Sequence, residues 1–314
     1  MTLVVCRIDK AELFIQSDTK AIDDFGSSTE FNLRQNQPLA GLLKTVILHP
    51  HVCLSFAGQS QFATQFLKRF MAEDLTLWNT PRLIKELSEL HEAARQECEF
   101  ILCEAINRSP HITVIKSGKT EVDVPNAWIG SQPAFEAYQQ AFHAQNKSNP
   151  LNERMRAAFR TLIDDPSHPE VGHFHIEAYL DHNISIGDSV FLYEWKAEWD
   201  TGSEIFHIEA DAWTSLRLGE ASYGAYGTSY LRSVSTKRHA IAVHFPHARM
   251  GILWCTQIDC EQPRFYRDCD AQQFLDRVWQ EHRIAMEGPA IINESEFRFI
   301  RSPESIGQAK SAKQ

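Results

Sequence analysis

The most constraining feature of this chain is the order in which strand-like and helix-like segments follow one another. β-prone runs at 3–8 and 12–17 are separated by a short polar turn, a pattern typical of a β-hairpin. Two more strand-like runs, 44–48 and 52–57, flank a His-Pro-His turn. The chain is therefore predicted to open with two antiparallel hairpins.

Helical patterns follow the second hairpin. A first helix is predicted after Gly58, and a second is predicted to start at Thr80-Pro81, where Thr is a favourable N-cap and Pro a favourable first helical residue. Further strands are predicted at 100–106, 111–116, 120–124, 127–130 and 174–180, and further helices at 133–145 and 152–162. This order is expected of two antiparallel sheets packed together with helices outside, which is an α+β fold.

Four residues carry a candidate chemistry along this framework. Thr2 follows the initiator Met, and Asp18, Lys44 and Gly58 come at predicted strand ends downstream. Removal of Met1 would leave one residue with both a hydroxyl nucleophile and an α-amine. An α-amine has a pKa of about 7.7 to 8.0 and is partly neutral at cell pH, so it is able to take the hydroxyl proton.

The motifs around these residues resemble a known family. The runs are TLVVCR, IQSDTKA, KTVILHPHVCLSFAG and ITVIKSGKTEVDVPNAWIGSQPAFEAY. They are similar to those of proteasome-type β subunits, including the bacterial peptidase subunit that pairs with an unfoldase ATPase, within the N-terminal nucleophile (Ntn) hydrolases. The resemblance covers residues 1–184 and implies a four-layer αββα sandwich of two antiparallel sheets.

The resemblance assigns a role to each of the four residues. Thr2 matches the nucleophile, and Asp18 matches the carboxylate that orients Lys44. The Lys44 charge would stabilise the alkoxide of Thr2 as it forms. Gly58 matches the residue whose backbone N–H forms the oxyanion hole, where the chain must approach the substrate carbonyl closely.

A second group of residues matches the family less completely. Ser131 matches a serine near the terminal amine, and Asp164 or Asp165 would match an aspartate that completes its hydrogen-bond network. The run 164–173 keeps only pieces of the family motif at this place, and the loop between the second and third strands is longer than the family pattern. A changed substrate pocket is therefore expected.

The expected function is cleavage of an amide or peptide bond through an acyl ester on Thr2, without a cofactor. The resemblance implies a homo-oligomer, and it leaves an ATPase partner open. Two alternatives remain: a catalytically silent relative that keeps the fold for assembly or binding, and a small-molecule amidase on the same scaffold. Retention of Thr2, Asp18 and Lys44 together favours a hydrolase.

Composition restricts the partners. The formal net charge of −10, without clustered Lys and Arg outside the last residues, argues against a nucleic-acid-binding surface. The chain has no signal-peptide pattern and no apolar run long enough to span a membrane, so a soluble cytoplasmic protein without a membrane partner is expected. Seven cysteines without a CxxC motif favour reduced thiols.

The rest of the chain lies beyond the resemblance. Residues 185–300 are predicted to form a β-rich extension with strands at 190–199, 205–213, 240–245 and 251–256 and one helix at 271–286, and residues 301–314 a disordered tail. The Gly- and Tyr-rich run 219–230 is interpreted as a turn region or a flexible aromatic loop. His173 and His175 alternate on a strand, but a single HxH is a weak zinc signal, and no metal site is expected.

Overall fold

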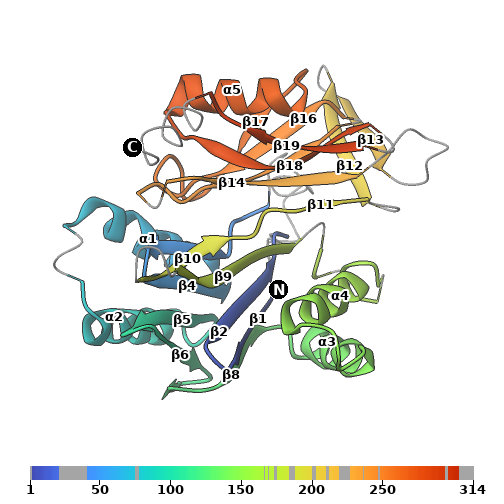
Figure 1. Ribbon diagram of the computed structural model, residues 1–314. Coiled ribbons are helices and arrows are strands. Elements are labelled where there is room, and N and C mark those ends of the chain that lie inside the picture. The colour runs from blue at the N-terminus through green and yellow to red at the C-terminus, as the bar shows by residue number, and fades with distance from the viewer. Residues whose placement is uncertain are drawn as a thin grey trace. The chain divides into compact units, whose positions relative to one another are not determined.

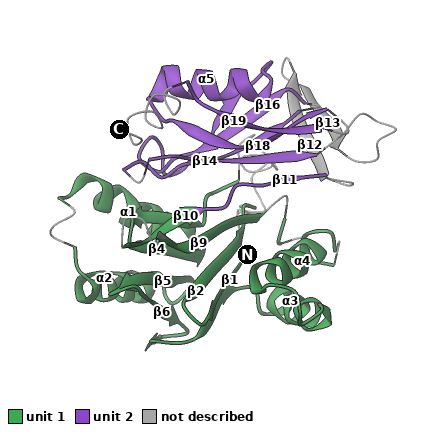
Figure 2. Cartoon of the chain, viewed as in Figure 1, with its two compact units in different colours: residues 1–36, 40–192 green, residues 37–39, 193–314 purple. Residues whose placement is uncertain are grey.

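The chain divides into two compact units. The computed structural model describes residues 2–20, 41–74, 78–165, 167–168, 170–172, 175–183, 188–199, 203–209, 212–218, 227–235, 237–246, 248–293 and 296–303. The first unit comprises residues 1–36 and 40–192, and the second residues 37–39 and 193–314 (Figure 2). The fold is mixed α+β with antiparallel sheets.

The first sheet of the first unit contains the amino-terminal hairpin, as predicted. Its strands follow the order β10-β9-β2-β1-β8. Their bounds are β1 (Leu3–Asp9), β2 (Glu12–Asp18), β8 (Asn126–Gly130), β9 (His175–Asn183) and β10 (Asp188–Tyr193). The pairing of β1 with β2 runs from Val4 opposite Ser17 to Asp9 opposite Glu12, so the start of β1 lies beside the end of β2.

The second sheet contains the second predicted hairpin and has the order β3-β4-β5-β6-β7. Its bounds are β3 (Thr45–His49), β4 (Val52–Gly58), β5 (Cys98–Ile106), β6 (Ser109–Lys116) and β7 (Lys119–Val122). Strand β8 of the first sheet contacts β4, β5 and β6, and β1 contacts β4. The Sγ atoms of Cys6 and Cys103 lie 3.5 Å apart between the two sheets.

Two pairs of helices contact these sheets (Figure 1). Helices α1 (Ser60–Ala72) and α2 (Thr80–Ala93) contact the second sheet, whereas α3 (Gln132–Ala144) and α4 (Leu151–Ile163) contact the first. The cap predicted for α2 was off by one residue. The N-cap is Asn79, whose side chain accepts a hydrogen bond from the Arg82 N–H at 3.0 Å. Thr80 is the first helical residue, and its hydroxyl donates to Glu104 instead.

The second unit is built on a larger antiparallel sheet. Its order is β17-β16-β15-β14-β18-β19, with β11 on β14, and β12 and β13 form a separate hairpin. The bounds are β11 (Ala197–Glu198), β12 (Ser203–Glu209), β13 (Ala212–Leu218), β14 (Thr228–Ser233), β15 (Ile241–Phe245), β16 (Met250–Trp254), β17 (Arg264–Tyr266), α5 (Ala271–His282), β18 (Met286–Asn293) and β19 (Glu296–Arg301).

Three segments in this region depart from the sequence prediction. The run 190–199 is two strands, because β10 completes the first sheet while β11 pairs with β14 in the second unit. The predicted strand 205–213 falls on two strands, because β12 ends at Glu209 and β13 begins at Ala212. Helix α5 ends at His282 and not at Met286, because Arg283 adopts the left-handed conformation (φ 56°) that closes a helix.

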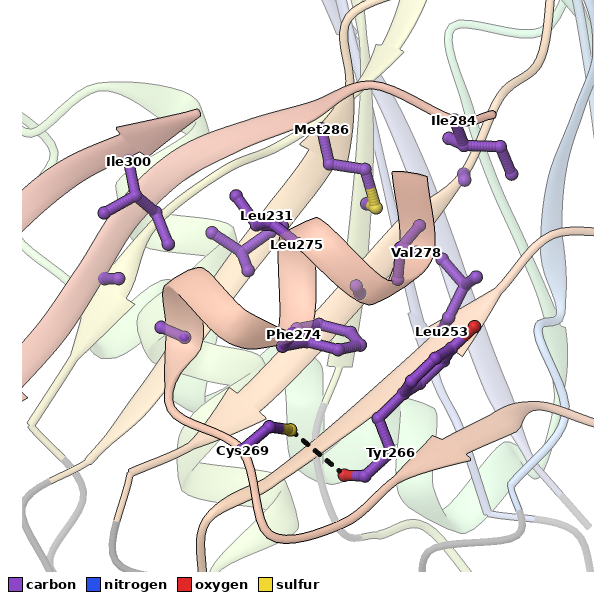
Figure 3. Packing of buried hydrophobic residues seen from close by; sticks show 14 of the residues in the cluster. Leu231, Leu253, Tyr266, Cys269, Phe274, Leu275, Val278, Ile284, Met286 and Ile300 are labelled. Atoms are coloured by element: carbon purple, nitrogen blue, oxygen red, sulfur yellow. Dashed lines mark hydrogen bonds between the residues drawn. The ribbon is translucent and has the colours of Figure 1, made fainter. Parts of the chain in front are cut away.

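Helix α5 forms the core of the second unit with the sheet (Figure 3). Its apolar face carries Phe274, Leu275 and Val278, which pack in one buried cluster with Leu253 and Met286. The helix begins with a capping box, since the Asp270 side chain accepts from the Gln273 N–H and the Gln273 side chain accepts from the Asp270 N–H.

One buried imidazole makes the stability of this unit depend on pH. His244 bonds the Cys269 carbonyl oxygen through Nε2 at 3.0 Å, while Nδ1 is buried and has no hydrogen-bond partner in the described part of the chain. Burial lowers the pKa of His244 to about 4, and Arg249 acts in the same direction, against Asp270 and the Cys269 carbonyl. As the pH falls, His244 therefore becomes protonated near pH 6.5 in the unfolded state but only near pH 4 in the folded state.

We therefore expect the free energy of unfolding to fall between pH 6.5 and pH 4 because of this residue. At pH 4.5 the contribution is roughly 2–3 kcal/mol. The measurement is urea unfolding of wild type and His244→Gln at pH 7 and pH 4.5. Between pH 7 and pH 4.5, the free energy of unfolding of the wild type should fall by that amount more than the free energy of unfolding of His244→Gln. An equal fall in the two proteins would contradict the assignment.

Some sequence predictions fall on residues outside the described ranges. These include most of the Gly- and Tyr-rich run, residues 304–314 of the predicted tail, and His173. His175 is buried, and its Nε2 lies 2.9 Å from the Glu177 carboxylate. Among the described residues, no group of three metal-binding side chains comes together and no helix is long and apolar enough to cross a membrane.

Candidate active site

The β1–β2 hairpin brings Thr2 and Asp18 together. Thr2 precedes β1 and Asp18 ends β2, so antiparallel pairing places both residues at the same end of this strand pair. The Thr2 hydroxyl donates to Asp18 Oδ1, which also accepts the Leu3 N–H at 3.1 Å. Both side chains are buried.

Lys44 joins them from the residue that precedes β3. Its Nζ donates to Asp18 Oδ2 at 2.9 Å, to the Thr2 hydroxyl oxygen and to the Lys20 carbonyl oxygen. These three acceptors match the three N–H bonds of an ammonium group. The backbone holds this residue in place, because the Phe56 N–H donates to the Lys44 carbonyl at 3.0 Å.

The segment before Lys44 lies tightly against the end of the first hairpin. The Leu42 N–H donates to the Thr19 carbonyl oxygen at 2.9 Å. A Cβ atom at Gly41 would overlap the same carbonyl group, so any larger residue would force the two segments apart. A glycine here therefore helps set the position from which Lys44 reaches Asp18.

The ion pair is fully enclosed, and its electrostatics follow from that. Lys44 is 5% exposed and Asp18 0%. Burial lowers the pKa of Lys44, while the charge of Asp18 and its hydrogen bond act in the opposite direction. Asp18 Oδ2 also accepts the Lys20 N–H at 3.1 Å, so the carboxylate is well supplied with donors.

Gly130 and Ser131 hold Thr2 from the other side. The Ser131 N–H donates to the Thr2 carbonyl oxygen at 2.7 Å. Gly130 has a φ of 101°, and a Cβ there would overlap that same carbonyl oxygen. Ser131 is also the N-cap of α3, where its hydroxyl oxygen accepts the Ala134 N–H at 3.3 Å.

Gly58 is the last residue of β4 and is exposed, with a φ of 92°. A Cβ at this position would overlap the Glu97 carbonyl oxygen on the adjacent chain segment. The preceding residue, Ala57, approaches Gly130, whose added Cβ would lie 3.4 Å from the Ala57 methyl group. Gly58 therefore follows directly after a residue that lies beside Gly130, the glycine that approaches the Thr2 carbonyl group.

The carboxylate on Ser131 is neither of the predicted aspartates. The Ser131 hydroxyl donates to Glu170 Oε1 at 2.9 Å. Asp165 is partly exposed and accepts the Ser167 N–H at 2.9 Å, while Asp164 is exposed and is the C-cap of α4. The departure of the run 164–173 from the family motif was the available signal, but it did not point to Glu170.

No protein-family model and no curated protein matches the chain. The chemistry of the site is therefore argued from the geometry. A buried hydroxyl bonded to an ammonium group is poised to lose its proton, because a nearby positive charge stabilises the alkoxide. Thr2 has such a hydroxyl.

Glu170 has the properties of an ionised hydrogen-bond acceptor. Burial by itself raises the pKa of its carboxyl group. The hydrogen bonds from its own N–H, from Ser131 and from His168 outweigh burial and hold the pKa below its usual value. His168 Nδ1 lies 3.6 Å from Oε1. Glu170 is thus suited to orient the Ser131 hydroxyl next to Thr2.

If Glu170 positions Ser131 for catalysis, Glu170→Ala is expected to lower kcat/KM by about 10- to 100-fold. A hydrogen bond to a charged acceptor contributes roughly 1.5–3 kcal/mol, which corresponds to that range. Glu170→Gln should recover part of the loss, because the amide oxygen still accepts from Ser131. The matched control is Asp165→Ala, which should keep kcat/KM within about twofold of wild type because Asp165 bonds Ser167 and not Ser131. A larger loss of kcat/KM in Asp165→Ala than in Glu170→Ala would assign the positioning role to Asp165.

Proposed function

We propose that the chain is an N-terminal threonine hydrolase that cleaves amide or peptide bonds through an acyl ester on Thr2. The observation that carries the proposal is that Lys44 Nζ bonds the Thr2 hydroxyl and the Asp18 carboxylate at once, in a buried setting. A purely structural ion pair would not need a hydroxyl group bonded to both of its partners.

In the first step, the α-amine that Met1 removal frees takes the proton of the Thr2 hydroxyl. Oγ1 attacks the substrate carbonyl carbon, and the Lys44 ammonium group stabilises the developing charge on Oγ1. The Gly58 N–H is assigned to the carbonyl oxygen, which becomes an oxyanion. The C–N bond then breaks, the amine product leaves with the proton, and an ester to Thr2 remains.

In the second step, water hydrolyses the ester. The amine of Thr2 takes a proton from the attacking water, and Oγ1 leaves with a proton returned by the same group. Ser131, fixed by Glu170, lies against the Thr2 backbone and is suited to orient this amine. Burial lowers the pKa of Lys44, and the Asp18 carboxylate opposes that effect and so favours the charged form of the lysine.

The layers of the first unit support the same proposal. Helices α1 and α2 contact the second sheet, the second sheet contacts the first, and the first sheet contacts α3 and α4. We infer that these layers form the four-layer αββα sandwich of Ntn hydrolases. In that arrangement a nucleophile at the start of β1 meets a lysine at the start of β3, as Thr2 and Lys44 do here.

The deciding experiment is the intact mass and N-terminal residue of the purified protein, before and after incubation with an epoxyketone or a β-lactone. We expect Thr2 as the first residue and a gain of one inhibitor mass. Thr2→Ala should lose the adduct, whereas Thr113→Ala, which changes another buried threonine, should keep it. A retained Met1 or an unreactive Thr2 would overturn the hydrolase proposal and favour a non-catalytic binding protein.

A further inference from the structure

A pocket lies at the far end of β4, the strand that ends at Gly58. It is a pocket of about 250 Å³. Its lining residues are His49, Val52, Phe70, Trp78, Asn79, Thr80, Leu83 and Glu104. Val52 begins β4 and Gly58 ends it, so the strand separates the pocket from the candidate oxyanion residue by about 20 Å, at roughly 3.3 Å per residue.

The floor of the pocket is a row of side chains across the second sheet. Val52 pairs with His49 on one side and with Glu104 on the other, and Glu104 pairs in turn with His111. Directly opposite residues on neighbouring strands share a face of the sheet, so the row is presented to one side. The walls come from α1 and from the start of α2.

The walls are aromatic. The rings of Phe70 and Trp78 lie with their centroids 5.0 Å apart. The Arg82 guanidinium stacks on the Trp78 ring at 4.1 Å from its centroid, and Glu73 neutralises this guanidinium at 2.8 Å. One aromatic ring that lines the pocket, Trp78, therefore already binds a cation from outside the lining.

Glu104 is a buried carboxylate with few donors. It is 6% exposed, and its single hydrogen bond among the described residues comes from the Thr80 hydroxyl. An ionised carboxylate has room for about four hydrogen bonds. Burial raises the pKa of this carboxyl group, and Asp123 adds to the effect, whereas the Thr80 hydrogen bond and His111 oppose it. The carboxylate therefore gains from any donor that enters the pocket.

We propose that this pocket binds a small organic cation, an amidinium or primary ammonium group carried on one aromatic or apolar ring. The cationic N–H groups bond Glu104, since a charged donor gives the strongest bond to a carboxylate. The ring lies against Phe70 and Leu83. A cavity of roughly 150 Å³ takes up benzene, so 250 Å³ holds one ring with a small polar group.

The experiment is calorimetric titration of the full chain with benzamidine and with its neutral isostere benzamide. We expect benzamidine to bind at least about tenfold more tightly, because only the amidinium pairs with the carboxylate. Glu104→Gln keeps the acceptor for Thr80 but removes the charge, and should weaken benzamidine binding about tenfold and leave benzamide unchanged. Leu83→Phe, which fills the pocket, should weaken both.

Thr2→Ala separates this proposal from the proposed hydrolase and should leave benzamidine binding unchanged. Loss of binding in Thr2→Ala with retention in Glu104→Gln would move the ligand to the candidate active site and overturn the pocket proposal. Equal affinities for benzamidine and benzamide, or no benzamidine binding by wild type, would overturn it as well. If Glu104→Gln does not fold, the two ligands and Leu83→Phe still decide.

Discussion

Lys44→Met is expected to lower kcat/KM by about 10²- to 10³-fold or more. The variant keeps the length of the side chain but removes the charge that stabilises the developing Thr2 alkoxide, and removing one such stabilising group costs about that much. Adduct formation with a threonine-directed electrophile should slow by a similar factor. Intact-mass kinetics on the purified variant measure this directly.

The same substitution has a second effect on stability, and the two need to be separated. Lys44→Met leaves Asp18 buried without its cation, which costs roughly 3–5 kcal/mol. The double variant Lys44→Met/Asp18→Asn removes both charges, so we expect it to recover most of the stability but none of the activity. Recovery of activity in the double variant, or full activity in Lys44→Met, would contradict the proposed role of Lys44.

Gly130→Ala is expected to destabilise the first unit by about 3 kcal/mol and to abolish adduct formation. A side chain at a φ of 101° is strained, and the new Cβ would overlap the Thr2 carbonyl oxygen. That carbonyl accepts the Ser131 N–H, so the nucleophile, its backbone and Ser131 would all shift. Urea unfolding and electrophile labelling measure the two effects.

Gly118→Ala is the matched control. Gly118 also has a positive φ, 71°, but its added Cβ would meet only the flexible Gln96 side chain. We expect a loss of about 1–2 kcal/mol and normal labelling. Equal losses in the two variants would mean that backbone strain alone, and not the close approach to Thr2, explains the effect at Gly130.

The elements that sequence alone predicted well are those with a strong local pattern. The two hairpins and helices α1 to α4 carry alternating or helical apolar periodicity and clear turns. The hairpin strands and helices α3 and α4 were predicted within one residue of their bounds, and α1 and α2 begin where the sequence predicted, after Gly58 and at Thr80. The two errors at helix ends arose where a neighbouring residue had an equally good or better local signal. Asn79 precedes Thr80 with an equally good capping side chain, and Arg283 ends α5 although the apolar pattern continues to Met286.

The candidate site divides in the same way. Thr2, Asp18 and Lys44 lie within one residue of strand ends, so the predicted hairpins already implied that they would be near one another. Glu170 lies between α4 and β9, where no periodicity indicates direction. The contact between the Glu170 carboxylate and Ser131 joins residues 39 positions apart in the chain, so it is visible only in the tertiary structure.

Sequence by itself determined the order of elements, the hairpin pairing and the meeting of Thr2 with Asp18, because short-range pairing and side-chain periodicity are local properties. The tertiary structure decided which strands joined which sheet. It placed β10 and β11 in different sheets, although the sequence pattern predicted a single strand over 190–199. It also made the pocket around Glu104, since a cavity depends on the packing of helices and strands far apart in the chain.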